Sequence, residues 1–94
     1  MTVFWASAAE QDRADIIDYI SQDNPLAAIR MDELFAEAAG RLAEYPQLGK
    51  TGLIPGTREL IPHESYRLVY EVQDNTVWIL ALVHTARMRP PSQR

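Results

Sequence analysis

The stretch "YRLVYEVQDNTVWILALVHTAR", residues 66–87, decides the fold. Two runs rich in β-branched and aromatic residues flank Asp74 and Asn75, which tolerate the positive φ angles of a two-residue turn. The pattern therefore predicts a β-hairpin. Its turn pairs Gln73 with Thr76 and, counted along both strands, Arg67 with Leu82.

Side chains on a strand alternate between the two faces of the sheet. One predicted face is wholly apolar and carries Tyr66, Leu68, Tyr70, Val72, Val77, Ile79, Ala81 and Val83. The opposite face carries Arg67, Val69, Glu71, Trp78, Leu80, Leu82 and His84. On this second face His84 is expected diagonal to Arg67, close enough for both side chains to contact one ligand.

Two helices precede the hairpin. A capping box of Ser7 and Glu10 is expected to open the first helix. Asn24 reads as the N-cap of the second helix, with Pro25 at its first position, and Pro46 stops that helix. The apolar stripe of the second helix consists of Met31, Phe35, Ala38, Leu42 and Tyr45. We expect the two helices to pair antiparallel.

The remaining segments complete a single domain, residues 1–94. Residues 3–6 form a short β-like run, residues 46–57 form a loop rich in proline and glycine, and residues 58–61 form a short strand. The predicted class is α+β, in β-α-α-β-β-β order. An antiparallel sheet packs against the helical hairpin.

Composition excludes several classes of function. The chain has no cysteine, so neither a disulfide framework nor a thiolate metal site is possible. Its two histidines show no repeated ligand spacing, and we expect no metal and no cofactor. The apolar run at 77–83 is too short to span a bilayer, and there is no signal-peptide pattern, so a cytoplasmic location is expected.

Charge is distributed unevenly along the chain. The net charge of −4 combines a first half with three arginines against nine acids and a second half with six cations against four acids. Residues 1–49 thus carry −6 and residues 50–94 carry +2. The first half reads as a solvated scaffold, whereas the second half could face an anion.

These features resemble the RelE/ParE superfamily of toxins from type II toxin–antitoxin modules, which includes plasmid stabilisation proteins. The most specific motifs are "TREL", "YRLVYEV" and the "HTAR" exit from the last strand. The resemblance implies a cognate antitoxin that wraps the toxin. It also implies that operator DNA is contacted only through the antitoxin complex.

The superfamily contains two activities. RelE-like members enter the ribosomal A site and cut mRNA, whereas ParE-like members poison DNA gyrase and have no known catalytic chemistry. Arg58, Arg67 and Arg87 match basic positions of the RelE-like pattern. Two features depart from that pattern. Leu60 stands where the pattern has a second lysine. RelE also has a C-terminal element that bears a tyrosine, whereas this chain has no tyrosine after Tyr70.

The favoured interpretation is a metal-independent endoribonuclease that cleaves mRNA on the ribosome. Such chemistry needs a proton carrier and cations that stabilise charge developing on phosphate. His84 is predicted to transfer the proton, Arg67 and Arg87 to stabilise the phosphate, and Arg58 and Arg89 to bind substrate. The alternatives are a gyrase inhibitor that acts by protein binding alone and an inactive relative that binds antitoxin or serves DNA autoregulation.

Structural roles compete with each of these assignments. Arg67 could pair with Glu71 or with Glu59 of a neighbouring strand, and His84 could be a structural residue at a strand end. The apolar side chains of Trp78, Leu80 and Leu82 are predicted to bind the antitoxin. A base-stacking floor is the alternative for them.

Overall fold

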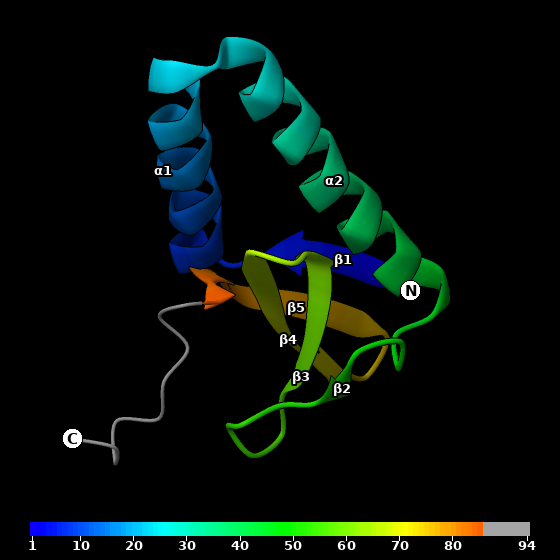
Figure 1. Cartoon of the computed structure of the whole chain (residues 1–94). Helices are drawn as coiled ribbons and strands as arrows, with labels where there is room; N and C mark the ends of the chain where they lie inside the picture. The colour runs from blue at the N-terminus through cyan, green and yellow to red at the C-terminus, as the bar shows by residue number, and fades with distance from the viewer. Residues whose placement is uncertain (86–94) are drawn as a thin grey trace, which may run out of the picture.

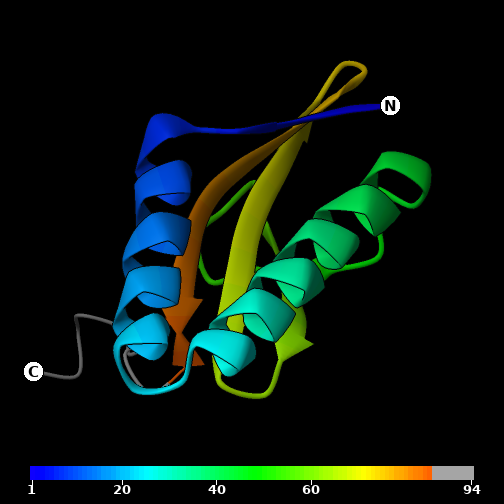
Figure 2. The same cartoon turned by 90° about the horizontal axis from the view of Figure 1, so that it is seen from above.

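The computed structural model describes residues 1–85, and the predicted α+β class and element order are confirmed (Figure 1). The elements are β1 (Thr2–Trp5), α1 (Ser7–Asp23), α2 (Pro25–Glu44), β2 (Lys50–Thr51), β3 (Arg58–His63), β4 (Tyr66–Gln73) and β5 (Thr76–His84). The sheet order is β1-β5-β4-β3-β2, and the two helices cover one face of the sheet (Figure 2). The sheet is mixed, because β1 runs parallel to β5 while the other pairs are antiparallel. The short strand β2 lies within the segment predicted as loop.

The helix boundaries follow the predicted signals at the second helix but not at the first. The Asn24 side chain accepts a hydrogen bond from the Ala27 N–H at 3.1 Å, and α2 ends at Glu44, before Pro46. The capping box expected at Ser7 is wrong, because Ala6 is the N-cap of α1 and makes no side-chain cap bond. The Ala6 N–H donates to the Ile79 carbonyl at 2.8 Å, so the strand pairing holds this residue extended and sets where the helix begins.

The hydrophobic core lies between the helices and the face of the sheet that they cover. Phe35 of α2 and Tyr66 of β4 meet edge to face, with ring centroids 5.6 Å apart. The buried cluster consists of Ala9, Phe35, Ala38, Ala39, Leu42, Tyr66, Leu68, Tyr70, Val77, Ile79 and Leu82. We call this covered side the helix face of the sheet and the opposite side the open face.

The hairpin register is as predicted near the turn and differs beyond it. Asp74 adopts the left-handed conformation with φ of 55°, and Gln73 pairs with Thr76. An irregularity follows the pair of Tyr70 with Ile79, after which Val69 pairs with Ala81. Leu80 is therefore an extra residue, a β-bulge. The predicted pairing of Arg67 with Leu82 is wrong, because Arg67 pairs with Val83.

An acid of α1 satisfies the backbone of β5 just after the bulge. The Leu82 N–H donates to the Asp12 carboxylate at 3.0 Å. Strand β1 ends at Trp5, opposite Ile79, so it does not reach this part of the β5 edge. A buried N–H group without an acceptor is costly, and Asp12 supplies one where the neighbouring strand is missing.

Candidate functional site

Arg67 is bound to a buried acid. Its Nη1 donates to Glu59 Oε1 at 2.7 Å, and the Glu59 side chain is only 4% exposed whereas that of Arg67 is 28% exposed. The second carboxylate oxygen of Glu59 accepts the Leu53 N–H at 3.2 Å. Arg67 Nε is buried and finds no hydrogen-bond partner within the described part of the chain. Of the two acids considered as partners from the sequence, Glu59 is the one that Arg67 contacts.

His84 lies on the helix face of the sheet. It pairs across the strands with Tyr66, and the two rings meet edge to face at 5.3 Å between centroids. Arg67 follows Tyr66 in β4, so its side chain lies on the open face. The expectation that His84 and Arg67 share a face is wrong, because the bulge at Leu80 inserts one residue between the turn and His84.

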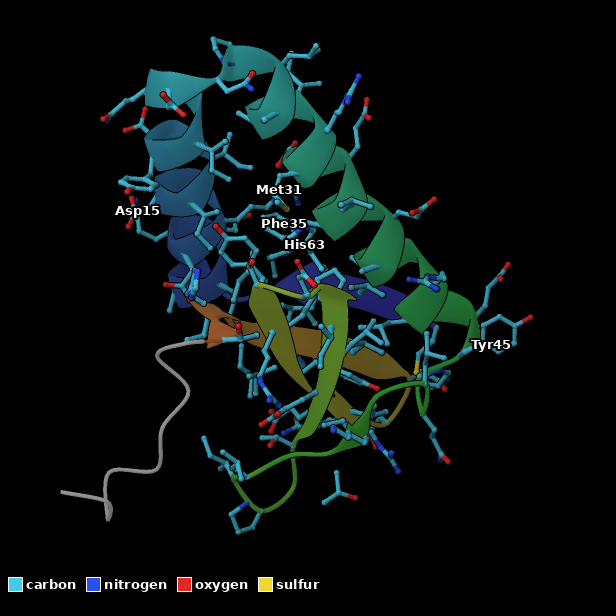
Figure 3. The ribbon with its side chains drawn as sticks, in the orientation of Figure 1. Asp15, Met31, Phe35, Tyr45 and His63 are labelled. Carbon is cyan, nitrogen blue, oxygen red and sulfur yellow. The ribbon has the colours of Figure 1, made fainter. Side chains whose placement is uncertain are left out.

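The structure forms a row of rings that the sequence analysis did not predict. His63 ends β3 and lies beside Tyr66 with ring centroids 6.2 Å apart, so His63, Tyr66 and His84 follow one another across three strands. His63 and Phe35 both contact the Tyr66 ring, and Figure 3 labels the two residues in the region between the sheet and α2. Nδ1 of His63 accepts the Ser65 N–H at 3.0 Å, which ties the ring to the turn before β4.

Arg58 belongs to a different cluster, at the end of α2. Its Nη1 donates to the Gly49 carbonyl at 2.7 Å, and it pairs across the strands with Tyr70. The Tyr70 hydroxyl donates to the Pro46 carbonyl and accepts the Gly49 N–H, both at 2.8 Å. Burial raises the pKa of Tyr70 above its ordinary value of 10.0, partly offset by the Gly49 hydrogen bond and the charge of Arg58.

The predicted catalytic and substrate-binding residues that fall within residues 1–85 do not come together at one site. Arg67 lies on the open face, His84 on the helix face, and Arg58 is bound to the loop after α2. Arg87 and Arg89 lie outside the described residues. Among residues 1–85 the strands place two cations, Arg67 and Lys50, and two acids, Glu59 and Glu71, on the open face, so the described part of this face has no excess of positive charge.

The three residues predicted to bind the antitoxin also separate. Trp78 stacks on Phe4 of β1 with ring centroids 5.1 Å apart, and Phe4 is exposed. Leu80 is half-buried at the bulge. Leu82 is 3% exposed and belongs to the core, so its predicted place on an accessible surface is wrong. Trp78 and Phe4 together form an aromatic pair near the edge of the sheet.

A groove of about 1000 Å³ runs between the two helices. Its lining combines apolar and acidic side chains: Glu10, Arg13, Ala14, Ile17, Asp18, Ser21, Pro25, Ala28, Ile29, Asp32 and Glu33. Arg13 bridges the helices through an ion pair with Asp32 at 2.7 Å, and its guanidinium lies 4.7 Å from the centre of the Trp5 ring. Ile29 lies off the apolar stripe predicted for α2, is exposed and lines this groove, and an apolar residue off the stripe is the sequence signal that indicates the groove.

Residues 1–85 hold neither a cluster of metal-ligating side chains nor a membrane-spanning helix. Among residues 1–85, no group of three or more histidine, cysteine, aspartate or glutamate side chains is arranged to hold a metal ion. In the same range no helix is long and apolar enough to cross a membrane.

Comparison with known proteins establishes the family. The family model described as "ParE toxin of type II toxin-antitoxin system, parDE" matches residues 3–89. The chain belongs to the ParE toxin family. Toxin RelE2 of Caulobacter vibrioides is 41% identical over 86 residues, which cover 92% of this chain and 97% of that protein.

A solved structure described as the chromosomal ParDE TA system from P. aeruginosa shares the fold. Its TM-score is 0.79 with 20% sequence identity, over 89% of this chain and 95% of that one. The protein is thus a toxin of a type II toxin–antitoxin system, within the RelE/ParE superfamily that the motifs indicated. Membership of the ParE toxin family implies a cognate antitoxin as its partner.

Proposed function

We propose that this toxin arrests growth by binding a protein target and that, as for ParE-like members, the target is DNA gyrase. The ion pair between Arg67 and Glu59 carries the proposal. A cation that stabilises phosphate must be available to the substrate, and this one is held at 2.7 Å by a buried carboxylate. Exchanging that carboxylate for phosphate would leave the Glu59 charge buried and unpaired, which is costly.

The position of His84 supports the same conclusion. A general base must come within hydrogen-bond reach of the proton that it removes. Both histidines of the described chain contact Tyr66, on the face that the helices cover. Arginine stays protonated and is a poor base, and among residues 1–85 the open face carries no histidine. The carboxylate nearest to Arg67 is that of Glu59, which is buried and already bound by Arg67.

Ribosome-dependent mRNA cleavage is the second candidate function. Two observations favour it: the relative with 41% identity is named Toxin RelE2, and the Arg67 side chain keeps 28% of its surface exposed. In this case Arg67 and Arg87 would stabilise the phosphate, His84 would transfer the proton, and Arg58 and Arg89 would bind mRNA.

One pair of measurements separates the two functions. After induction of the toxin in cells, primer extension on a reporter mRNA detects cleavage, and a supercoiling assay with purified DNA gyrase detects inhibition. The proposal predicts intact transcripts, filamentous cells and loss of supercoiling activity. Cut transcripts from translating ribosomes with unimpaired gyrase would reject it in favour of the endoribonuclease. In both cases the site of action is expected to be the cytoplasm.

The groove between α1 and α2 is the proposed antitoxin-binding site. Its acidic side chains include Glu10, Asp18, Asp32 and Glu33, so the antitoxin segment is expected to be amphipathic and basic. The exposed Phe4 and Trp78 pair is proposed as a second contact with the same partner.

A surface substitution in the groove tests this assignment. Ile29→Ser removes an exposed apolar side chain from the lining and should weaken antitoxin binding about tenfold or more, while toxicity is kept. Tyr19→Ser is the matched control, because Tyr19 is an exposed α1 residue that does not line the groove. Equal antitoxin affinity for the two variants would show that the groove is not the binding site.

A further inference from the structure

The loop between β2 and β3 presents apolar side chains to solvent. Leu53 and Ile54 at its tip are each 62% exposed. The loop projects from the sheet on the side away from the two helices (Figures 1 and 2). The groove between the helices and this tip are therefore on opposite sides of the molecule, and one partner segment in the groove leaves the tip accessible.

Hydrogen bonds fix the shape of this tip. The Gly52 N–H donates to the Thr57 carbonyl at 2.8 Å, and the Thr57 N–H and hydroxyl both donate to the Ile54 carbonyl, at 3.1 and 2.6 Å. The Leu53 N–H donates to the buried Glu59 carboxylate. The two exposed side chains are thus held on an ordered backbone, which reduces the entropy that a binding partner must overcome.

Backbone chemistry adds to the order of the tip. Pro55 restricts its own φ, and Gly56 has a φ of 85°, a conformation that side chains rarely adopt. The sequence "GLIPG" therefore encodes a turn that points two large aliphatic side chains outward. Large apolar groups exposed together on a rigid turn are typical of an interaction surface.

The charge around the tip indicates the chemistry of the partner. The segment "YPQLGKTGLIPGTR", residues 45–58, contains Lys50 and Arg58 but no acid, although the whole chain carries −4. Glu59, which follows the segment, is buried and paired with Arg67. Arg58 is bound to the Gly49 carbonyl, so Lys50 is the freely exposed cation of the segment. One exposed cation is too few for a phosphate backbone, which is usually contacted by several. An apolar pocket edged by carboxylates on a folded protein fits better.

We infer that Leu53 and Ile54 form the contact by which this toxin engages its protein target, separately from the antitoxin in the helical groove. The inference rests on the proposed function, because it assumes a protein target. The two side chains enter an apolar pocket of the target, and Lys50 lies beside acids at its edge. The contact needs no reaction and no rearrangement of the toxin.

The experiment uses the full chain and purified DNA gyrase holoenzyme. The double variant Leu53→Ser, Ile54→Ser should weaken gyrase inhibition about tenfold or more, because buried aliphatic anchors dominate such contacts. Antitoxin affinity and thermal unfolding should stay as in the wild type, since both side chains are largely exposed. Lys50→Glu should also weaken gyrase inhibition, and the loss should be larger at low salt than at high salt, because salt screens the charge. Ile29→Ser in the helical groove, with the opposite pattern of effects, is the control.

Each result bears on one of the two proposals. Full inhibition by a folded double variant, together with full inhibition by Lys50→Glu, would overturn the assignment of the tip. A wild type that leaves gyrase active while transcripts are cut would instead overturn the proposed function. Lost inhibition with retained antitoxin binding would support the assignment, and the antitoxin measurement excludes misfolding as its cause.

Discussion

Replacing Arg67 with alanine is expected to destabilise the protein before it affects any chemistry. The substitution leaves the Glu59 carboxylate, 4% exposed, with the Leu53 N–H at 3.2 Å as its remaining hydrogen bond among the contacts described. Breaking a buried ion pair in this way typically costs about 3–5 kcal/mol. Arg67 is itself 28% exposed, so partial screening reduces the expected cost to about 2–3 kcal/mol. The free energy of unfolding of a domain of this size is about 5–14 kcal/mol, so the variant is expected to fold but to be clearly less stable.

A double-mutant cycle measures this coupling. Urea unfolding of Arg67→Ala gives its cost directly, and urea unfolding of the wild type, Arg67→Met, Glu59→Gln and their double variant gives the four free energies of the cycle. The double variant should recover most of the lost stability, because it carries neither the Arg67 charge nor the Glu59 charge. The coupling free energy should be about 1–3 kcal/mol. A cost below about 0.5 kcal/mol for Arg67→Ala would refute the reasoning, since exposed pairs contribute about that much.

The same four proteins separate structure from catalysis. If Arg67 serves to neutralise Glu59, the double variant regains toxicity together with stability. If Arg67 stabilises phosphate, the double variant stays inactive in mRNA cleavage although it is as stable as the wild type. Toxicity of Arg67→Ala alone cannot distinguish these roles, because the single variant changes stability as well.

Three further substitutions and one change of pH test the packing around the sheet. Tyr70→Phe should cost about 2–4 kcal/mol, because two buried backbone groups lose their partner, while the exposed Tyr19→Phe should cost almost nothing in the same urea titration. The folded state raises the pKa of Tyr70, so it keeps its proton where the unfolded chain has lost it. Stability should therefore fall as pH rises above about 10, and less so in Tyr70→Phe. Gly49→Ala would place a Cβ 2.7 Å from the Glu59 carbonyl oxygen and 2.8 Å from the Tyr70 ring, and should lower the melting temperature by about 4–8 °C for each kcal/mol of strain. Asp12→Ala should cost about 1–3 kcal/mol and speed hydrogen exchange at the Leu82 amide; unchanged exchange would contradict the role assigned to Asp12.

The parts of the fold that local chemistry determines could be predicted from the sequence. Asn24 accepts a backbone N–H of the first turn of α2 and Pro25 is its first residue, so both signals lie within one turn. Asp74 takes the positive φ that the hairpin requires. The start of α1 could not be predicted, because a long-range hydrogen bond from Ala6 to Ile79 decides it. Each correct prediction concerns groups a few residues apart, whereas the error at Ser7 involves a strand paired from the far end of the chain.

The burial of Glu59 is a second long-range effect. In a strand that alternates, this glutamate falls on the open face, where a charge is normally solvated. The loop that follows β2 folds over that face and donates the Leu53 N–H to the carboxylate. Neither strand propensity nor charge pattern indicates the path of a loop. The sequence therefore allowed Glu59 and Glu71 as partners of Arg67, and loop packing distinguishes them.

The β-bulge at Leu80 has the largest consequence for function. Uninterrupted alternation would bury Ala81 and expose Leu82, whereas the extra residue places Leu82 in the core. Leu82 in place of Ala81 buries three more side-chain carbons, worth about 2 kcal/mol, while His84 takes the place of Val83 on the same face. Asp12 satisfies the N–H of Leu82. Both gains depend on where α1 lies, so the run "WILALVH" gives no local sign of the bulge. The same inserted residue turns His84 toward Tyr66 and away from Arg67. Packing of the core thus determines that the proton carrier and the cation of the predicted nuclease lie on opposite faces of the sheet.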